Sequence, residues 1–312
     1  MRFPSIKLWT TQRENNCKAI RIFSKRISYS VFFSKLSRFI NKHLYKLGIG
    51  SSLNRYDNSF TIYSSKADSD LYKNFDKSSK FINFGSGTFF HNRWKNYDYP
   101  GLTDYYKSVQ GSDGEDFYSI NLCDPNLSVP EKNESVDLIY CSHTLEHIDA
   151  KSSNRFLIEC FRILKKNGVM RVALPNTKND FFLLRCILSQ NSISKEIKQN
   201  YLRKVASHIL TDTQKLSMEE IIDLSNQTKQ DSEKFFNNSI KMNNDFAEFK
   251  ESNPERHINY WDFENLITKT SKIGFSYCIP CYQGISVASP FSNLHVFDNT
   301  EPQISIYADI IK

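Results

Sequence analysis

The sequence predicts an α/β fold with a parallel sheet, and three stretches carry that prediction. The apolar run Phe81–Phe84 is followed directly by a glycine turn, Gly85-Ser86-Gly87. A second short strand, Trp94–Asp98, comes next and ends on an acid. The run Ser135–Cys141 is largely apolar and lies between polar segments, which is typical of a parallel strand covered on both faces.

The glycine turn and the acid at the end of the next strand predict a nucleoside pocket. Glycines adopt positive φ and let a backbone approach a ligand closely. In open parallel sheets, ligands lie at the carboxyl ends of the strands, and an acid there accepts hydrogen bonds from ribose hydroxyls. We therefore expect Gly85, Gly87 and Asp98 to meet at one cavity.

Downstream, apolar periodicity predicts alternating strands and helices. The expected helices cover 150–165, ended by a capping Gly168, and 261–272. The expected strands cover 117–122, 169–174, 275–281 and 304–311. Residues 177–256 are rich in Asn, Ser, Lys and Gln, and their patterns predict a helical insertion.

The first 50 residues differ in charge from the rest of the chain. They hold eleven Lys or Arg and one acid, whereas the remaining residues hold 30 basic and 33 acidic side chains. An apolar stripe through 18–47 predicts a basic amphipathic helical arm over 1–50, followed by a linker over 51–79 and a main domain over 80–312. Three interpretations are open: a helix packed on the body, a helix on an anionic membrane surface, or a cleaved targeting peptide.

The amino-acid composition indicates the cellular compartment in which the protein is expected. No apolar run approaches the roughly 18 residues of a membrane-spanning helix. The seven cysteines are scattered and odd in number, which suits free thiols in a reducing compartment. We expect a cytoplasmic protein, with peripheral membrane contact through 18–47 as the open alternative.

The order of these motifs resembles class I S-adenosylmethionine-dependent methyltransferases, type 11-like, and most closely their branch associated with polysaccharide biosynthesis. The resemblance rests on Phe84–Gly87, Trp94–Asp98, Asp137–His147, Phe161–Gly168 and Leu174–Asn176, with His257, Trp261 and Gly274 in the tail. It implies a Rossmann-like seven-stranded sheet whose last strand is antiparallel, and S-adenosylmethionine as cofactor.

The resemblance also implies roles for individual residues. Phe84, Gly85, Ser86 and Gly87 would face the methionine part of the cofactor, and Asp98 its ribose. Asn121 and Leu122 would border the adenine, while Cys141, Ser142 and His143 would flank the methionine and the sulfonium. The chain departs from the family at Phe89, where many relatives have a glycine, and at Asn121, where an acid is usual. The amide oxygen of Asn121 can still accept a hydrogen bond from an amine.

A sulfonium methyl is already activated, so catalysis is mainly positioning of donor and acceptor. A hydroxyl acceptor would in addition need a base. The candidates are His143, Glu146, His147 and His257, and we favour His143 because it would lie nearest the methyl group. Structural roles compete: His147 and Glu146 could brace the following helix, and His257 could simply pack. We expect no metal site, because His-x-x-Glu-His lacks a well-placed third ligand.

We therefore expect a methyltransferase that acts on a small hydroxyl-bearing or sugar acceptor. An RNA or protein methyltransferase that uses the basic arm is an alternative, although the near-neutral body gives no strong nucleic-acid signal. A methyltransferase-like protein without activity is another. A dinucleotide-dependent oxidoreductase is disfavoured, because its fingerprint needs a further glycine where Phe90 stands.

Overall fold

The structure is a computed structural model of the 312-residue chain. It describes residues 7–10, 19–27, 30–101, 103–179, 248–252, 254 and 256–312, with a few isolated positions between 180 and 247. Most of the expected insertion at 177–256, including its predicted helices, lies outside the described residues.

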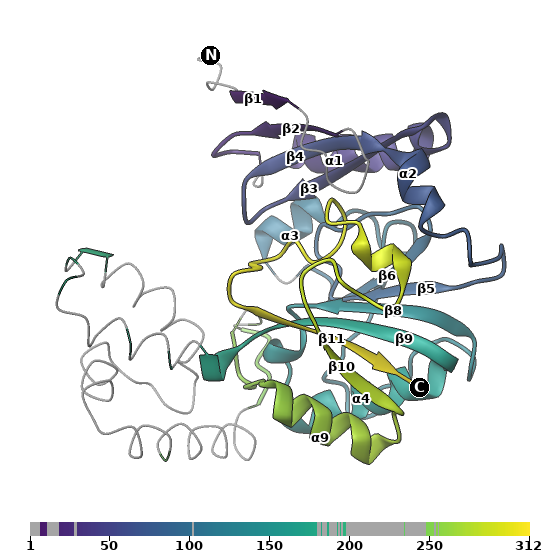
Figure 1. The fold of residues 1–312 in the computed structure, drawn as a ribbon, viewed down its shortest axis with the longest axis vertical. Helices are drawn as coiled ribbons and strands as arrows, with labels where there is room; N and C mark the ends of the chain where they lie inside the picture. Colours follow the sequence, from purple (N-terminus) through teal and green to yellow (C-terminus); the bar gives the residue numbers. More distant parts are fainter. Residues whose placement is uncertain are drawn as a thin grey trace.

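The main body is built on a seven-stranded sheet with the order β10-β11-β9-β8-β5-β6-β7 (Figure 1). Its strands are β5 (Phe81–Phe84), β6 (Trp94–Asp98), β7 (Tyr118–Ser119), β8 (Val136–Ser142), β9 (Leu164–Pro175), β10 (Tyr277–Cys281) and β11 (Ser305–Ile311). Strands β7, β6, β5, β8 and β9 run parallel, and β11 is antiparallel to both of its neighbours. The predicted α/β fold with an antiparallel last strand is confirmed.

Alternating residues of the central strands feed two apolar layers, as a strand covered on both faces requires. On β8, Ile139 and Cys141 pack with helices α4 (Ala150–Ile163) and α9 (Phe263–Ile273). Leu138 and Tyr140 point the other way, into a layer completed by the segment around the short helix η4 (Ser289–Ser292). The central strands are thus buried on both sides, which fixes the positions of the loops at their carboxyl ends.

The N-terminal region is a second sheet rather than an arm and a linker. Strands β1 (Lys7–Thr10), β2 (Ala19–Phe23), β3 (Ile49–Asn54) and β4 (Ser59–Ser64) form an antiparallel sheet of order β1-β2-β4-β3 (Figure 1). Helix α1 (Val31–Phe39) continues through η1 (Ile40–Leu44) and η2 (Tyr45–Leu47), and α2 (Ser65–Asp70) follows β4.

Two expectations for this region are wrong. The predicted helical stripe does not begin near residue 20, because Ala19–Phe23 pairs with β4 as a strand. Gly48 does end the helix, with φ of 95°, but the residues after it form β3 instead of a linker. The sheet escapes hydrophobic pattern analysis because part of its interior is polar: Asn41 Nδ2 donates to Ser51 O at 2.8 Å, and both residues are buried.

A buried polar cluster joins the two sheets. Asp68 on α2 is fully buried and lies 2.9 Å from His91 Nε2, across the gap to the loop before β6. It also accepts hydrogen bonds from Tyr45 Oη and from Asn293 Nδ2, the latter at 2.6 Å. Because each of these groups would be costly to bury alone, the cluster ties the N-terminal sheet to the body.

The main domain differs from expectation in smaller ways. The third strand is only Tyr118–Ser119, shorter than the predicted 117–122. Gly168 does not cap α4: the helix ends at Ile163, Leu164 is already extended, and Asn167 takes the left-handed conformation with φ of 63°. Helix α9 begins after Asp262, which caps it by accepting from Asn265 N.

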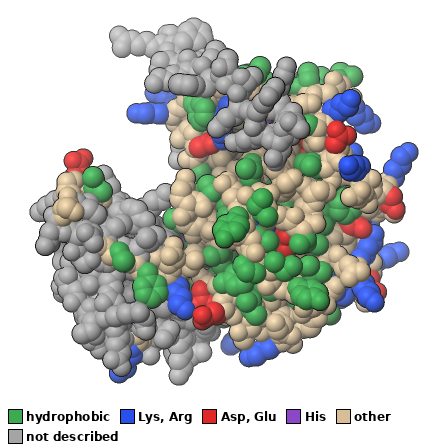
Figure 2. All heavy atoms as spheres, viewed as in Figure 1, with side chains coloured by type: hydrophobic (Ala, Val, Ile, Leu, Met, Phe, Trp, Pro, Cys, Tyr) green, Lys and Arg blue, Asp and Glu red, His purple; other side chains and the backbone are tan. Residues whose placement is uncertain are grey.

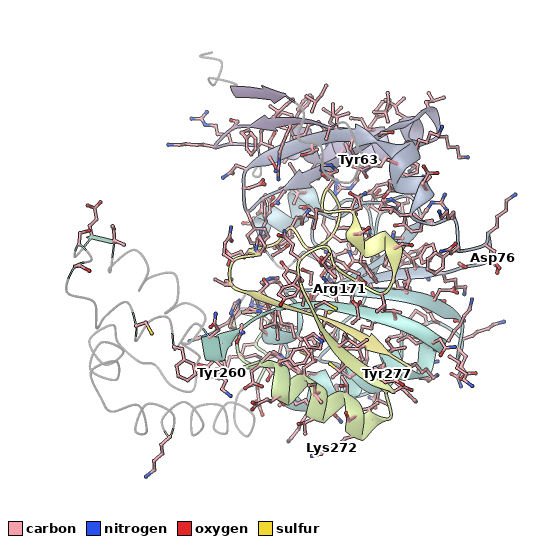
Figure 3. The ribbon with its side chains drawn as sticks, in the orientation of Figure 1. Tyr63, Asp76, Arg171, Tyr260, Lys272 and Tyr277 are labelled. Atoms are coloured by element: carbon pink, nitrogen blue, oxygen red, sulfur yellow. The ribbon has the colours of Figure 1, made fainter. Side chains whose placement is uncertain are left out.

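An arginine lies buried in the far half of the sheet. Arg171 on β9 is fully buried and lies 3.0 Å from Asp309 on β11 and 2.5 Å from Asp298. Figure 3 shows it beneath the C-terminal segment that crosses the sheet. Its remaining hydrogens go to the carbonyls of Tyr282 and Ile285. This ion cluster anchors the loop after β10 to the sheet.

Apolar side chains gather on one face of the molecule. Figure 2 shows hydrophobic side chains gathered on the face that carries β10 and the loop after it, where Tyr277, Tyr282 and Ile285 are exposed. Among the described helices, none combines the length and apolar character needed to cross a bilayer.

Candidate active site

The glycine turn after β5 needs glycine for reasons of shape. Gly85 and Gly87 have φ of 66° and 54°, in the left-handed region that side chains disfavour. A Cβ on Gly85 would lie 2.0 Å from Thr144 Oγ1, whereas one on Gly87 would make only an ordinary contact of 3.4 Å with Tyr106. The turn is therefore pressed against the loop that follows β8.

Asp98, at the end of β6, is hydrogen-bonded to this turn. Its Oδ2 accepts from Gly87 N at 2.6 Å and its Oδ1 from Tyr99 N at 2.8 Å. The side chain is buried, and burial raises the pKa of Asp98 to about 6 despite these two donors. A buried carboxylate that still ionises reluctantly would gain from further hydrogen-bond donors.

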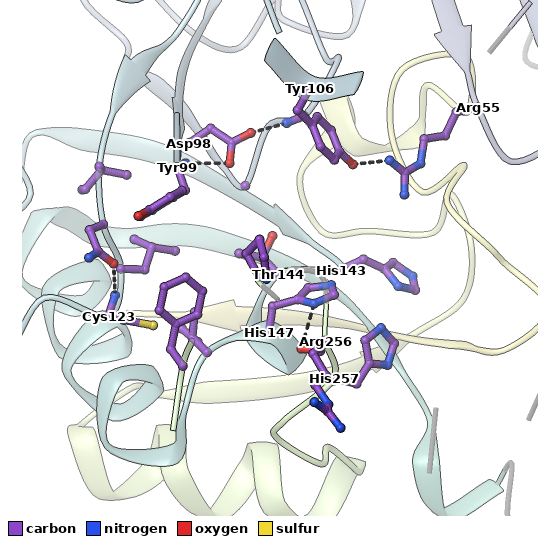
Figure 4. A pocket seen from close by; sticks show the side chains of 18 of the residues that line it. Arg55, Asp98, Tyr99, Tyr106, Cys123, His143, Thr144, His147, Arg256 and His257 are labelled. Atoms are coloured by element: carbon purple, nitrogen blue, oxygen red, sulfur yellow. Dashed lines mark hydrogen bonds between the residues drawn. The ribbon is translucent and has the colours of Figure 1, made fainter. Parts of the chain in front are cut away.

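A cavity of about 390 Å³ joins the glycine turn and Asp98 to a group of histidines. Figure 4 looks into it, with Asp98 and Tyr106 at one end and His143, His147 and His257 at the other. Its volume is in the range of small-molecule pockets, about 300–1,000 Å³. Much of its wall comes from the segments at the carboxyl ends of β5, β6, β7 and β8, as in other open α/β sheets.

The structure brings most of the predicted site residues to this cavity. Those that line it are Gly85, Gly87, Asp98, Asn121, Leu122, His143 and His147. Ser86 and Ser142 line an adjoining cavity of about 130 Å³. The side chains of Phe84 and Cys141 are fully buried in the core next to α4, so any contact these two residues make with a ligand is through the backbone.

Asn121 stands where an acid is usual. Its Oδ1 accepts from Cys123 N at 2.9 Å and so shapes its own loop. A carbonyl oxygen has two lone pairs, which leaves one for a ligand amine.

Sequence reasoning missed the residues that reach the cavity from the N-terminal sheet. Arg55, in the turn after β3, donates a hydrogen bond to Tyr106 Oη of α3 (Asp104–Val109), and Tyr56 lies beside it in the cavity wall. Tyr106 in turn lies against Gly87. The only local signal in the sequence is that a tyrosine lies next to Arg55 and another next to Lys107. This pattern is too common to indicate a binding site.

The histidines surround one acid. Glu146, in the turn η3 (Leu145–His147) after β8, is only 2% exposed. Burial alone would raise its pKa, but the imidazoles of His143, His147 and His257 lower the pKa of Glu146 to about 2. His143 Nδ1 lies 3.1 Å from Glu146 Oε1, and His143 Nε2 lies 2.8 Å from Ser305 Oγ. Both ring nitrogens of His143 therefore have partners within the protein.

His147 is held differently. Its Nδ1 lies 3.2 Å from the carbonyl oxygen of Arg256 (Figure 4). Because a carbonyl can only accept, Nδ1 carries a hydrogen, and in the neutral imidazole the lone pair is on Nε2. Helix α4 is capped by Asp149, which accepts from Lys151 N and Ser152 N, and not by His147.

His257 comes next to Glu146 through the backbone. The amides of Ile258 and Asn259 both donate to Glu146 O, at 2.8 and 3.1 Å. The ring centroids of His147 and His257 are 4.8 Å apart. Glu146, His147 and His257 each offer a ligand atom within 4.8 Å of the others, so the argument that a third ligand is missing is wrong.

Comparison with known families finds a match that covers part of this site. Residues 105–172 match the family model of a methyltransferase domain. This match supports the expected resemblance to class I S-adenosylmethionine-dependent methyltransferases and does not show the branch associated with polysaccharide biosynthesis. The matched segment contains Asn121 and the whole loop from His143 to His147, while the glycine turn and Asp98 precede it.

Solved structures similar to this chain share little sequence with it. A putative O-methyltransferase from Nostoc punctiforme is 10% identical, with a TM-score of 0.34, over 79% of this chain and 56% of that one. PKMT2 from Rickettsia typhi, in complex with AdoHcy, is 10% identical with a TM-score of 0.33, over 75% and 48%. A putative Zn-dependent alcohol dehydrogenase from Rhodobacter sphaeroides is 9% identical with a TM-score of 0.39, over 80% and 90%. The chain thus spans about half the length of the first two. No curated protein matches the sequence.

Proposed function

We propose that this protein is an S-adenosylmethionine-dependent methyltransferase that transfers a methyl group to a hydroxyl of a small or sugar acceptor. One observation carries the proposal: a single cavity has a nucleoside-binding end at Gly85, Gly87 and Asp98 and an imidazole-rich end at His147 and His257. The first end suits the cofactor, and the second suits an acceptor that must lose a proton.

The residues present fit the cofactor. Asp98 presents a buried carboxylate with capacity for further donors, as two ribose hydroxyls require. The bare backbone at Gly85 lies in a cradle that a Cβ would fill. Leu122 and Ile148 supply apolar wall for the adenine, and Asn121 retains one acceptor lone pair toward its amine.

The cofactor, when bound, supplies a methyl group on a positively charged sulfur, so the protein needs mainly to align the acceptor oxygen with it. The acceptor oxygen forms the new bond to carbon with its own electron pair, the pair of the carbon–sulfur bond stays on sulfur, and the hydroxyl proton is released. We assign the loss of that proton to His147 rather than His143, since His147 Nε2 keeps a lone pair while both nitrogens of His143 have partners.

A methyl-transfer screen on sugar and other hydroxyl acceptors, followed by kinetics, tests the proposal. We expect His147→Asn to lower kcat by about 100-fold or more, in the range for a group that handles a proton, while the Kd for S-adenosylhomocysteine stays within about twofold. His143→Asn, the matched control, lowers kcat less. Equal losses in kcat and cofactor affinity for His147→Asn would reject its role, and transfer only to RNA or protein would reject the acceptor class.

We also propose that helix α1 and its continuation contact an anionic membrane surface. Phe32, Phe39 and Leu47 are 66%, 55% and 75% exposed, and their spacing places the first two on one helical face. Exposed Lys35 and Lys42 lie on the same stretch. The helix packs on its own sheet through other residues, so this face is not needed for the core.

Sedimentation with vesicles that contain phosphatidylserine tests this contact. Phe39→Ser combined with Leu47→Ser should weaken binding by at least about tenfold, because each exposed apolar side chain contributes up to about 1.5–3 kcal/mol when it is buried. Tyr282→Ser, at a position that is 81% exposed on another face, is the control. Unchanged sedimentation of the double variant would reject the membrane contact.

A further inference from the structure

In the cluster of Glu146, His147 and His257, the carboxylate of Glu146 has unused coordinating capacity. Neither carboxylate oxygen of Glu146 accepts a hydrogen bond from any described residue, although the side chain is almost fully buried. Such a group costs several kcal/mol to bury unless a charge compensates it. The imidazoles around it compensate in part, with His143 Nδ1 at 3.1 Å from Oε1 but not aligned as a hydrogen bond.

Backbone hydrogen bonds orient the histidines of the cluster, as they do in metal sites. His147 donates Nδ1–H to the carbonyl of Arg256 at 3.2 Å, which orients its ring and leaves Nε2 as the coordinating atom. Metal-bound histidines almost always have such a partner on the other nitrogen. His257 is fixed relative to Glu146 because the two following amides bind Glu146 O.

We propose that Glu146, His147 and His257 bind a divalent transition-metal ion at the acceptor end of the cavity. Two imidazoles and a carboxylate are the ligands of several catalytic Zn²⁺ and non-haem Fe²⁺ sites, which keep further positions open. Metal–ligand bonds of about 2.0–2.2 Å place ligand atoms roughly 3.4 Å apart in a tetrahedral site. The three candidate atoms lie within 4.8 Å of one another, so small side-chain rotations bring them together.

The position of this site deepens the proposed function and rests on it. His147 and His257 both line the cavity that holds the glycine turn, so an acceptor hydroxyl beside them would also bind the ion. A bound cation lowers the pKa of a coordinated hydroxyl. The O–H bond then breaks with the proton passing to water, and the oxygen keeps the electron pair that forms the bond to the methyl carbon. In this arrangement His147 promotes the loss of the proton as a ligand of the ion, and water rather than His147 Nε2 accepts the proton.

Binding of Co²⁺ to the full chain, after dialysis against EDTA, tests the site directly. We expect one equivalent with visible d–d absorption, and Zn²⁺ should displace it. His147→Asn and His257→Asn should each weaken binding by at least about 100-fold, since even an outer-shell partner is worth about 10–100-fold. His43→Asn, an exposed histidine on η1, is the matched control and should bind unchanged.

Thermal melts of each variant check that it is folded. Glu146 is not the first choice for substitution, because replacing a buried acid can destabilise the fold. Absence of the absorption band, or binding that survives His257→Asn, would overturn the metal site. Full methyl transfer by the EDTA-treated protein would overturn the catalytic role of the ion and leave the proposed function intact. Stoichiometric Co²⁺ binding without transfer to any hydroxyl acceptor would instead overturn the proposed function and leave the site.

Discussion

Asp98→Asn separates the two effects of burying this carboxyl group, one on stability and one on cofactor affinity. In the folded chain, burial raises the pKa of Asp98 to about 6 from the ordinary 3.8. At about 1.36 kcal/mol per pKa unit, this difference corresponds to about 3 kcal/mol. Since the folded state holds the proton more tightly, the stabilising contribution is complete below about pH 4 and is lost as the pH rises through 6.

The stability of the free protein should report this directly. The stability of Asp98→Asn relative to wild type should increase by up to about 3 kcal/mol between pH 4 and pH 7.5, because the wild type loses stability over this range while the amide has no charge to bury. Urea unfolding at both pH values measures it. Asp104→Asn, at a fully exposed carboxylate on α3, is the control and should show no such change.

The affinity of the wild-type protein for the cofactor should increase with pH, whereas its stability decreases. If ribose hydroxyls donate to an ionised Asp98, wild-type protein at pH 5 has only about a tenth of its carboxyls ready, so its Kd for S-adenosylhomocysteine should be about tenfold weaker than at pH 7.5. Asp98→Asn should bind about 10- to 100-fold more weakly at pH 7.5, as expected for loss of a charged hydrogen bond worth about 1.5–3 kcal/mol, and its affinity should not vary over this pH range.

Isothermal titration calorimetry at the two pH values provides the affinities. The reasoning fails if wild-type affinity is the same at pH 5 and pH 7.5, since the carboxyl would then not titrate in the free protein. It also fails if Asp98→Asn keeps wild-type affinity, because Asp98 would then not hold the ribose.

Three substitutions test other parts of the structure by their effect on thermal or urea unfolding. Gly85→Ala should destabilise the protein more than Gly87→Ala by over about 1 kcal/mol, because both glycines have positive φ but only the first Cβ collides with a neighbouring threonine; equal losses would refute the packing. Arg171→Met should cost about 3–5 kcal/mol by leaving two buried carboxylates uncompensated, whereas Lys165→Met removes a partly exposed ion pair worth less than about 1 kcal/mol; a small loss for Arg171→Met would contradict this account. Asp68→Asn should cost roughly 1–3 kcal/mol at pH 7, and the cost should shrink below about pH 4, since the pKa of Asp68 is lowered by its histidine and hydrogen-bond partners against the opposing effect of burial; a cost that does not depend on pH would show that the charge is irrelevant.

The main sheet could be predicted because its strands have recognisable local sequence patterns. Phe81–Phe84 and Val136–Cys141 are almost continuously apolar, since each is buried on both faces. The meeting of Gly85, Gly87 and Asp98 followed from topology alone, because the carboxyl ends of adjacent parallel strands share one edge. These features needed no knowledge of distant contacts.

The features that sequence reasoning missed depend on contacts between distant segments. His257 was a candidate from the sequence, but it lies more than a hundred residues after Glu146, and its place beside Glu146 depends on hydrogen bonds from the next two amides and on ring contact with His147. Strand β3, with the sequence IGSSLN, has no clear apolar alternation. Its inward side is satisfied by hydrogen bonds from α1 and η1, such as Ser37 to Ser51 at 3.1 Å, and polar burial of this kind leaves no hydrophobic pattern.

The division expected at residue 80 is therefore not a division of the molecule. Asp68 is fully buried only because His91 and Asn293, from the main domain, complete its hydrogen bonds. Arg55 reaches across the same boundary to Tyr106, which lies over Gly87. A buried charge is tolerated only where its hydrogen-bond partners are fixed in place. The N-terminal sheet and the main domain must therefore fold as one unit if the cofactor end of the cavity is to keep its shape.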